Sequence, residues 1–376
     1  MIFSLPILAA LSLANPQPLP GCSDTIAAKL RSQLTPVLEK STAEGKFSGV
    51  VVVACNGVPM YSVAYGMANR ANKTPNTLDT RFNLGSMNKM WTAIAIAQLV
   101  EQGKVDLDAP VGRYLPDLPN TAVRDRVLVK HLLSHTSGLG TYFTRGYLRN
   151  HVAITKASDL LPFFIDDSLS FAPGARFQYS NAGFALLGMI VERVSGMNYF
   201  DYMRGNVLAR AGMSPDLFVT LPIPAKGFAS GYVIPPGSSD SVENDNLLER
   251  SSSPAGGAYA SAADIIAFSR ALWSGKLVGS AIVNNFTTGK ADMGPIRYAY
   301  GFGESTSNGW RGVGHNGGAP GVGTDFISFP DQGIDAVVLT NIDMPAAGNV
   351  MGRIVSILTG APLRQMVEPP NGAPPP

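Results

Sequence analysis

The stretch SGVVVVACNGVPMYSVAY, residues 48–65, holds two runs rich in β-branched and aromatic residues on either side of Asn56-Gly57. Asn-Gly is a preferred pair for the tight turn of a hairpin, because both residues adopt a positive φ at low cost. Ser48–Ala54 and Pro59–Tyr65 are therefore predicted to form a β-hairpin. The pattern of Thr25–Ala43 predicts an amphipathic helix in front of it.

Further strands are predicted only near the other end of the chain, where a helix at Ala346–Leu358 follows them. The predicted strands are Tyr298–Gly303, Gly309–Gly314, Thr324–Phe329 and Ile334–Thr340. Helical patterning fills the region between, at Met87–Gln102, Val127–Ser134, Ala157–Asp166, Ala182–Ser195, Asn198–Ala211 and Ala262–Trp273. We therefore expect a sheet domain, built from both ends of the chain, that a largely helical insertion interrupts.

Composition excludes several classes of protein. The 376 residues are 45% hydrophobic and 15% charged, which is typical of a globular chain and not of a disordered one. The 29 Lys and Arg against 27 Asp and Glu leave a formal charge of +2, without the basic excess of nucleic-acid-binding proteins. We expect no nucleic-acid partner. The Pro-rich residues from Val367 onward are expected to be disordered.

Residues 1–14 are predicted to be a signal peptide. Ile2–Ala14 is apolar, but it is shorter than the roughly 20 residues that cross a bilayer, so no stable membrane span is expected. Ser12-Leu13-Ala14 supplies the small residues that signal peptidase needs, although no Lys or Arg precedes the apolar run. The expectation is export to the periplasm or the medium, and an ordinary apolar N-terminal segment is the alternative.

Cys22 and Cys55 are the two cysteines of the chain. They can form one disulfide in an oxidising compartment, and two buried thiols are the alternative. Residues 19–22 (LPGC) resemble a lipoprotein acylation site only weakly, because of the proline and the distance from the apolar run. No cysteine spacing suits zinc, and His131 and His135 lack the glutamate of a zinc-protease helix. We expect no metal or organic cofactor.

Ser86-Met87-Asn88-Lys89 stands at the start of an apolar helix and places a serine and a lysine on one helical face. A serine hydroxyl needs a neighbouring base to act as a nucleophile, and a lysine in a dry site can lose its proton near neutral pH. The helix N-terminus adds oriented N–H groups that favour negative charge. The motif predicts an activated serine; the alternative is a helix cap beside a solvated lysine.

Two further motifs are candidates for a cleft. Tyr179-Ser180-Asn181 precedes a predicted helix, so that Tyr179 and Asn181 either face a cleft or serve as base and cap of that helix. His315-Asn316-Gly317-Gly318 lies between two predicted strands, where glycines let a ligand approach closely. Residues 312–317 also match GxGxxG, but no helix follows, so a dinucleotide site is not predicted.

In this order, the three motifs resemble those of the serine β-lactamase and penicillin-binding-protein superfamily. The similarity is greatest to the branch of class C β-lactamases, D-alanyl-D-alanine carboxypeptidases and family VIII esterases, because Tyr179 stands where other classes carry serine. The segments HLLSHTSGL (131–139), PGARFQYSN (173–181), SPAGGAYASAAD (253–264) and GHNGGAPG (314–321) also resemble signatures of this branch. The resemblance covers about residues 24–360.

The resemblance implies an α/β (α+β) fold of the β-lactamase/transpeptidase-like type, with an antiparallel sheet flanked by helices. The implied domains are a discontinuous sheet domain, 24–69 plus 256–362, and a mostly helical domain, 70–255. A Pro-rich tail, 363–376, follows. His131 and His135 become structural residues that shape the loop after a helix.

Catalytic roles follow from the resemblance residue by residue. Ser86 is the nucleophile that forms an acyl-enzyme, Lys89 its base or proton-sharing partner, and Tyr179 the group that passes a proton to the leaving group. The implied substrate-orienting residues are Asn181, His315 and Gly317. The implied oxyanion hole consists of the backbone N–H groups of Ser86 and Gly318.

One departure concerns His315, because class C β-lactamases carry lysine there. A histidine of ordinary pKa is mostly neutral at pH 7, so binding of a substrate carboxylate should be weaker. We therefore expect a serine acyl hydrolase that acts on small esters. The enzymatic alternatives are a D-alanyl-D-alanine carboxypeptidase or D-aminopeptidase acting on peptides or amides, a β-lactamase, and an acyl transferase. The non-enzymatic alternative is a silent domain that binds cell-wall ligands.

Overall fold

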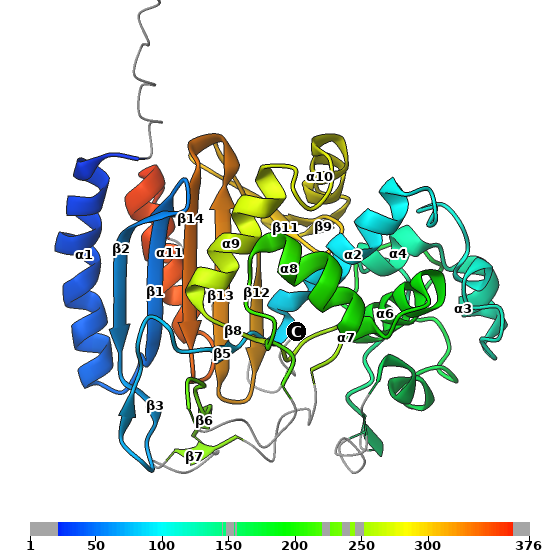
Figure 1. Cartoon of the computed structure of the whole chain (residues 1–376), viewed down its shortest axis with the longest axis horizontal. Coiled ribbons are helices and arrows are strands. Elements are labelled where there is room, and N and C mark those ends of the chain that lie inside the picture. Colours follow the sequence, from blue (N-terminus) through cyan, green and yellow to red (C-terminus); the bar gives the residue numbers. More distant parts are fainter. Residues whose placement is uncertain are drawn as a thin grey trace, which may run out of the picture.

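The computed structural model describes residues 22–144, 146–147, 154, 156–219, 226–234, 241–244 and 252–363. Within these residues, eight antiparallel strands form the main sheet in the order β2-β1-β14-β13-β12-β11-β10-β9 (Figure 1). They are β1 (Gly49–Cys55), β2 (Val58–Tyr65), β9 (Ala291–Met293), β10 (Ile296–Tyr298), β11 (Gly303–Ser307), β12 (Trp310–Ala319), β13 (Val322–Phe329) and β14 (Ile334–Thr340). The sheet is thus built from both ends of the chain, as predicted.

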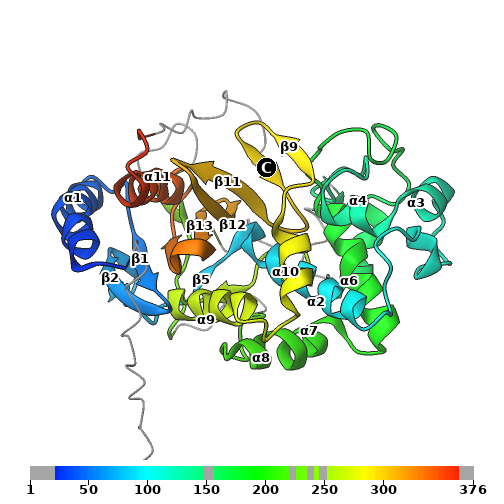
Figure 2. The same cartoon turned by 90° about the horizontal axis from the view of Figure 1, so that it is seen from above.

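Helices cover both faces of the sheet (Figure 2). α1 (Asp24–Ala43) and α11 (Ala346–Thr359) pack on one face, where Val51 and Val53 of β1 join their core. Val50 and Val52 point to the other face, into the core shared with α2 (Lys89–Glu101) and α9 (Ala262–Trp273). Because successive side chains of a strand alternate between faces, a strand buried on both sides is apolar throughout, which explains the run of four valines in β1.

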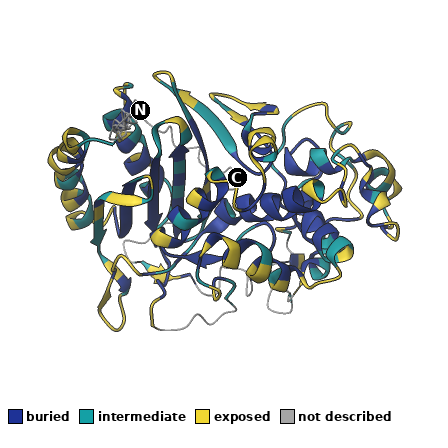
Figure 3. Cartoon of the chain, turned by 45° about the horizontal axis from the view of Figure 1, so that its top comes forward, coloured by how far each residue is buried: buried dark blue, intermediate teal, exposed yellow. Residues whose placement is uncertain are grey.

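The inserted region is largely helical and centres on α2, which packs against α6 (Asn181–Ser195). α2 is buried from Lys89 to Leu99, as Figure 3 shows by its dark colour, which explains why apolar residues occur on every side of it. The other helical segments are α3 (Thr121–Arg126), α4 (Val129–Leu133), Ala157–Phe163, α7 (Tyr199–Tyr202), Met203–Leu208, α8 (Ala209–Ala211) and, beyond α9, α10 (Ser280–Thr287). Short strand pairs accompany them: β3 (Met67–Asn69) with β4 (Thr74–Pro75), β5 (Phe82–Asn83) with β8 (Tyr259–Ala260), and β6 (Tyr232–Val233) with β7 (Val242–Glu243).

Several local predictions can be compared with the structure. The hairpin turn is confirmed, with φ of 48° at Asn56 and 79° at Gly57. The predicted strand Tyr298–Gly303 is wrong: β10 ends at Tyr298 and β11 begins at Gly303. Gly301, at φ 78°, lies in the reversal between them, and a residue in that conformation cannot continue a strand. The apolar residues of this segment are buried, but in a turn.

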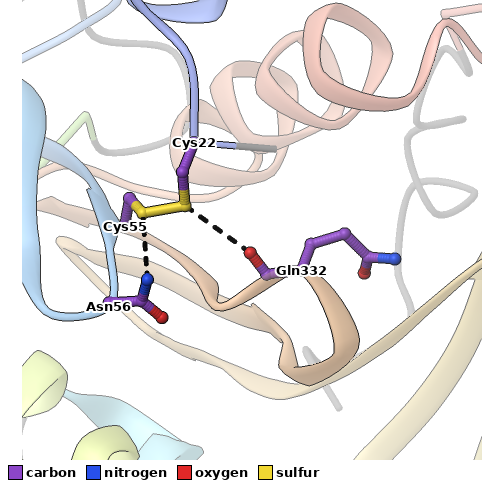
Figure 4. The surroundings of a disulfide bond; sticks show 4 residues. All are labelled: Cys22, Cys55, Asn56 and Gln332. Atoms are coloured by element: carbon purple, nitrogen blue, oxygen red, sulfur yellow. Dashed lines mark hydrogen bonds between the residues drawn. A yellow bond between two sulfur atoms is a disulfide. The ribbon is translucent and has the colours of Figure 1, made fainter. Parts of the chain in front are cut away.

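Cys22 and Cys55 form a disulfide, which settles the alternative that the sequence left open (Figure 4). The bond joins the segment before α1 to the end of β1. Asn56 donates a side-chain hydrogen bond to Sγ of Cys55 at 3.5 Å, and Sγ of Cys22 lies 3.6 Å from the carbonyl oxygen of Gln332. In this form the Cys22 thiol is not available for acylation. The predicted signal peptide and residues 364–376 of the tail lie outside the described residues.

No helix in the described ranges is long and apolar enough to cross a membrane.

Candidate active site

Ser86 and Lys89 lie at the entrance of α2. Ser86 belongs to the 3-10 turn Gly85–Asn88, and Lys89 is the first residue of α2. The fully buried Lys89 donates from Nζ to Oγ of Ser86 at 2.9 Å, to Oδ1 of Asn181 at 2.7 Å and to the carbonyl oxygen of Ala255 at 2.5 Å. The carbonyl oxygens of Asn181 and Ala255 thus accept hydrogen bonds from two N–H groups of Lys89. When the amine is uncharged, its lone pair is directed at the Ser86 hydroxyl, as a general base requires.

Tyr179 lies on the other side of this pair. Nζ of Lys89 is 4.8 Å from the centre of its ring. Burial raises the pKa of the Tyr179 phenol, and the nearby Ser86 hydroxyl opposes part of this rise. No described residue meets the distance and angle of a hydrogen bond to the buried phenol oxygen. A phenol with a raised pKa keeps its proton at neutral pH, which suits a proton donor better than a base.

The turn that carries Tyr179 is fixed by His135 and by the start of α6. Ser180, and not Asn181, caps α6, since its hydroxyl accepts from the N–H of Gly183 at 3.0 Å. The amide of Asn181 is therefore available to Lys89. The N–H of Ser180 donates to Nδ1 of the buried His135 at 3.0 Å, and the His135 ring stacks 4.2 Å from that of Tyr179. His135, assigned from the sequence only to a loop, also supports the Tyr179 ring.

β12 comes against the Ser86 turn through glycines. A Cβ on Gly85 would lie 2.7 Å from the backbone nitrogen of Gly318, and a Cβ on Gly317 would overlap the carbonyl oxygen of Leu84. Side chains at these positions would separate the two segments. The close approach places the Gly318 nitrogen beside the turn of Ser86, the two residues predicted to supply the oxyanion hole.

His315 has both ring nitrogens engaged. Nδ1 lies 2.5 Å from the carbonyl oxygen of Asn316, which only accepts, so Nδ1 carries the proton. Nε2 then accepts from the hydroxyl of Tyr298 at 2.8 Å. Burial, together with the nearby Lys89 charge, lowers the pKa of His315 to about 3. His315 is therefore a neutral group with no free donor. No local pattern singles out Tyr298, because it reaches His315 across the intervening strand β11.

A groove of about 480 Å³ opens beside Ser86 and Tyr179 and extends over β12 and β13 to α11. No lysine or arginine is among the described residues that line it. Two nearby arginines are directed elsewhere: Arg297 pairs with Asp292 at 3.2 Å and Arg311 with Glu304 at 2.6 Å. In the described part of the chain, no three His, Cys, Asp or Glu side chains are grouped so that they could hold a metal ion.

The sheet, the helical insertion and the Ser86–Lys89–Tyr179 arrangement define the class of serine hydrolases with a β-lactamase/transpeptidase-like fold. Residues 34–361 match the family model described as Beta-lactamase. The chain belongs to this family, whose members are serine hydrolases, and the resemblance seen in the sequence is confirmed.

Individual relatives agree with the family. The chain is 28% identical to penicillin-binding protein 4* of Bacillus subtilis (strain 168) over 335 residues, covering 83% of this chain and 72% of that protein. It is 39% identical to esterase EstB of Burkholderia gladioli over 184 residues, 45% of this chain and 47% of the other. The crystal structure of a penicillin-binding protein from Bacillus halodurans superposes with a TM-score of 0.78 at 32% identity, covering 85% of this chain and 98% of that one. The predicted fold is confirmed.

Proposed function

We propose that this chain is an esterase that works through an acyl-enzyme on Ser86. Oγ of Ser86 attacks the ester carbonyl carbon while Lys89 takes its proton, and the N–H groups of Ser86 and Gly318 stabilise the oxyanion. Tyr179 gives its proton to the departing alkoxide and regains one from Lys89. Water then attacks the acyl-enzyme, and the acid is released with Ser86 restored.

We choose esters as the substrates because of the protonation and hydrogen bonding of His315. β-Lactams and peptides with a free C-terminus bring a carboxylate into the site. His315 is neutral, both of its nitrogens are engaged, and no cation lines the described groove. An ester without a carboxylate needs no such partner. The 39% identity with the matched part of esterase EstB supports the same choice.

A substrate panel tests this proposal. We expect kcat/KM for 4-nitrophenyl butyrate to exceed that for a chromogenic cephalosporin and for a D-alanyl-D-alanine peptide. His315→Lys should narrow the gap between ester and cephalosporin, because it restores a cation. A cephalosporin hydrolysed faster than every ester would favour a β-lactamase. Faster peptide hydrolysis would favour the carboxypeptidase alternative.

Covalent labelling separates an enzyme from a silent binding domain. A fluorophosphonate should modify Ser86, and peptide mapping by mass spectrometry should locate the adduct there. An adduct on another serine would contradict the site. The absence of any adduct or turnover would favour the non-enzymatic alternative.

We also propose that the protein is exported. The Cys22–Cys55 disulfide supports this, because such bonds persist in oxidising compartments. Mature protein from the native host should then begin at or near Asn15, as N-terminal sequencing can determine. An intact Met1 on cytoplasmic protein would contradict export.

A further inference from the structure

The groove beside Ser86 holds one carboxylate. Asp325, on β13, is half-buried and lines the groove. It is the one acidic side chain among the described lining residues. In the strand register Asp325 stands directly opposite Asn316 of β12. Asn316 is two residues before Gly318 on the same strand. The carboxylate therefore belongs to the same wall as the predicted oxyanion hole.

The wall of the groove beside this carboxylate consists largely of glycines. Alternate residues of a strand share a face, so Asn316 shares its face of β12 with Gly312, Gly314 and Gly318. All four line the groove, where the side chain of Met344 lies over Gly318 and that of Ile327 over Gly312. Ser86 and Asp325 line the same groove, on either side of this part of β12.

No cation compensates Asp325 in the described structure. The nearby backbone N–H of Phe326 lowers the pKa of the carboxyl group, and no charged side chain of the described residues contributes to the shift. The neighbour on β14 is Val338, and Asp343, before α11, accepts from the N–H of Gly321 at 2.7 Å. Arg353 of α11 is exposed and does not line the groove. Burial raises the pKa of Asp325 to about 7, which reflects a charge without a compensating partner.

We infer that Asp325 binds a cationic group of the substrate, a protonated amine or a quaternary ammonium, in the groove that leads away from Ser86. The inference rests on the proposed esterase activity and narrows its substrate class. Gly318 and Asp325 lie on neighbouring strands and are offset by two residues along the strand direction. These two displacements place their Cα atoms about 8 Å apart. A chain of about five methylene groups spans such a distance. A carboxylate on the substrate would instead be repelled.

Three matched esters test this inference: 4-nitrophenyl 6-aminohexanoate, its uncharged isostere the heptanoate, and the anionic half-ester of heptanedioic acid. We expect kcat/KM to fall in that order. Asp325→Asn should reduce the ratio of the cationic to the uncharged ester at least about tenfold, because a charge-assisted hydrogen bond is lost. Butyrylthiocholine against 3,3-dimethylbutyl thiobutyrate repeats the comparison with the charge in the leaving group, and shows which side of the ester Asp325 contacts.

Asp292→Asn is the matched control. It removes the same charge from an exposed position on β9 that does not line the groove. The ratio of kcat/KM for the cationic ester to that for the uncharged ester should therefore remain that of the wild type. A ratio that Asp325→Asn leaves unchanged in both substrate pairs would overturn the inference while the esterase proposal stands. An equal loss in Asp292→Asn would assign the effect to the overall charge of the protein and would also overturn it.

A binding measurement keeps the inference testable without turnover. Ser86→Ala should bind 6-aminohexanamide more tightly than heptanamide in calorimetry, and the added Asp325→Asn change should remove the difference. Equal binding of the two amides would overturn the cationic site. Failure of the esterase proposal would instead appear as absence of ester turnover and of a Ser86 adduct.

Discussion

Lys89 is held by three acceptors, and two of them are carbonyl oxygens that cannot give a proton back. Of these three partners, the Ser86 hydroxyl is the one that can also donate to the amine. Two of these hydrogen bonds fix the position of the lysine, and the third is the contact through which we propose that it exchanges a proton with Ser86. Burial of the whole side chain keeps water from replacing Ser86.

Replacement of Lys89 should affect chemistry more than binding. We expect Lys89→Ala to lower kcat at least about 100-fold, in line with loss of a positioned base. Lys89→Arg is the matched variant, because it keeps a cation with donors but stays protonated. It should be similarly impaired. Circular dichroism checks the fold, and near-normal turnover in a folded Lys89→Ala variant would remove Lys89 from the mechanism.

Local spacing explains which site residues the sequence could indicate. Ser86 and Lys89 are one helical turn apart, and Tyr179 and Asn181 share one turn of the chain, so each pair is visible in a short window. Tyr298 and Asp325 approach the groove only through strand register, and the Ala255 carbonyl approaches Lys89 from a distant loop. No short window of sequence shows such relations. The catalytic roles themselves stay predictions.

At the scale of elements, α9 and β14 meet at a buried carboxylate. Asp335 of β14 accepts a hydrogen bond from Ser269 of α9 at 2.6 Å. Burial raises the pKa of Asp335 above that of an ordinary aspartate, to about 6. The ionised form is therefore less favourable in the folded protein than in the unfolded chain.

This carboxylate should make stability depend on pH. Between about pH 4 and pH 6 the folded state binds more protons at Asp335 than the unfolded state, so the free energy of unfolding falls as pH rises. Asp335→Asn keeps an acceptor for Ser269 and removes the titration. Between pH 4 and pH 7.5, the free energy of unfolding measured with urea should fall less in the variant than in the wild type. An equal fall in the variant and the wild type would contradict a raised pKa at Asp335.

Capping signals explain which elements were predicted well. Ser261 and Asp264 form a capping box, with reciprocal hydrogen bonds to each other's N–H groups, and α9 spans the predicted Ala262–Trp273. The short hairpin of β9 and β10 was not predicted, because three-residue strands carry little periodicity. The region Asn198–Ala211 is helical as predicted, but it includes a π-helical segment, Met203–Leu208, that periodicity does not distinguish.

At the scale of the whole molecule, the disulfide fastens the N-terminal helix to the sheet. Its cysteines are 33 residues apart, and closing a loop of this size stabilises a fold by about 2–4 kcal/mol. Cys22→Ser together with Cys55→Ser should lower the free energy of unfolding accordingly. Ester kcat/KM should not change, because neither cysteine lines the groove. Equal stability of the variant and the oxidised wild type in urea would contradict the prediction.

The pairing of β1 with β14 also has a consequence for biosynthesis. Residues 49–55 pair with residues 334–340, so the ribosome delivers one strand long before its partner. Throughout that interval one edge of β1 has no native partner, and an open, apolar edge invites aggregation. The sheet, and with it the contact between the Ser86 turn and β12, forms only after β12, β13 and β14 have been synthesised. Until then the exposed edge of β1 needs protection from other chains, and the arrangement of the candidate site cannot form.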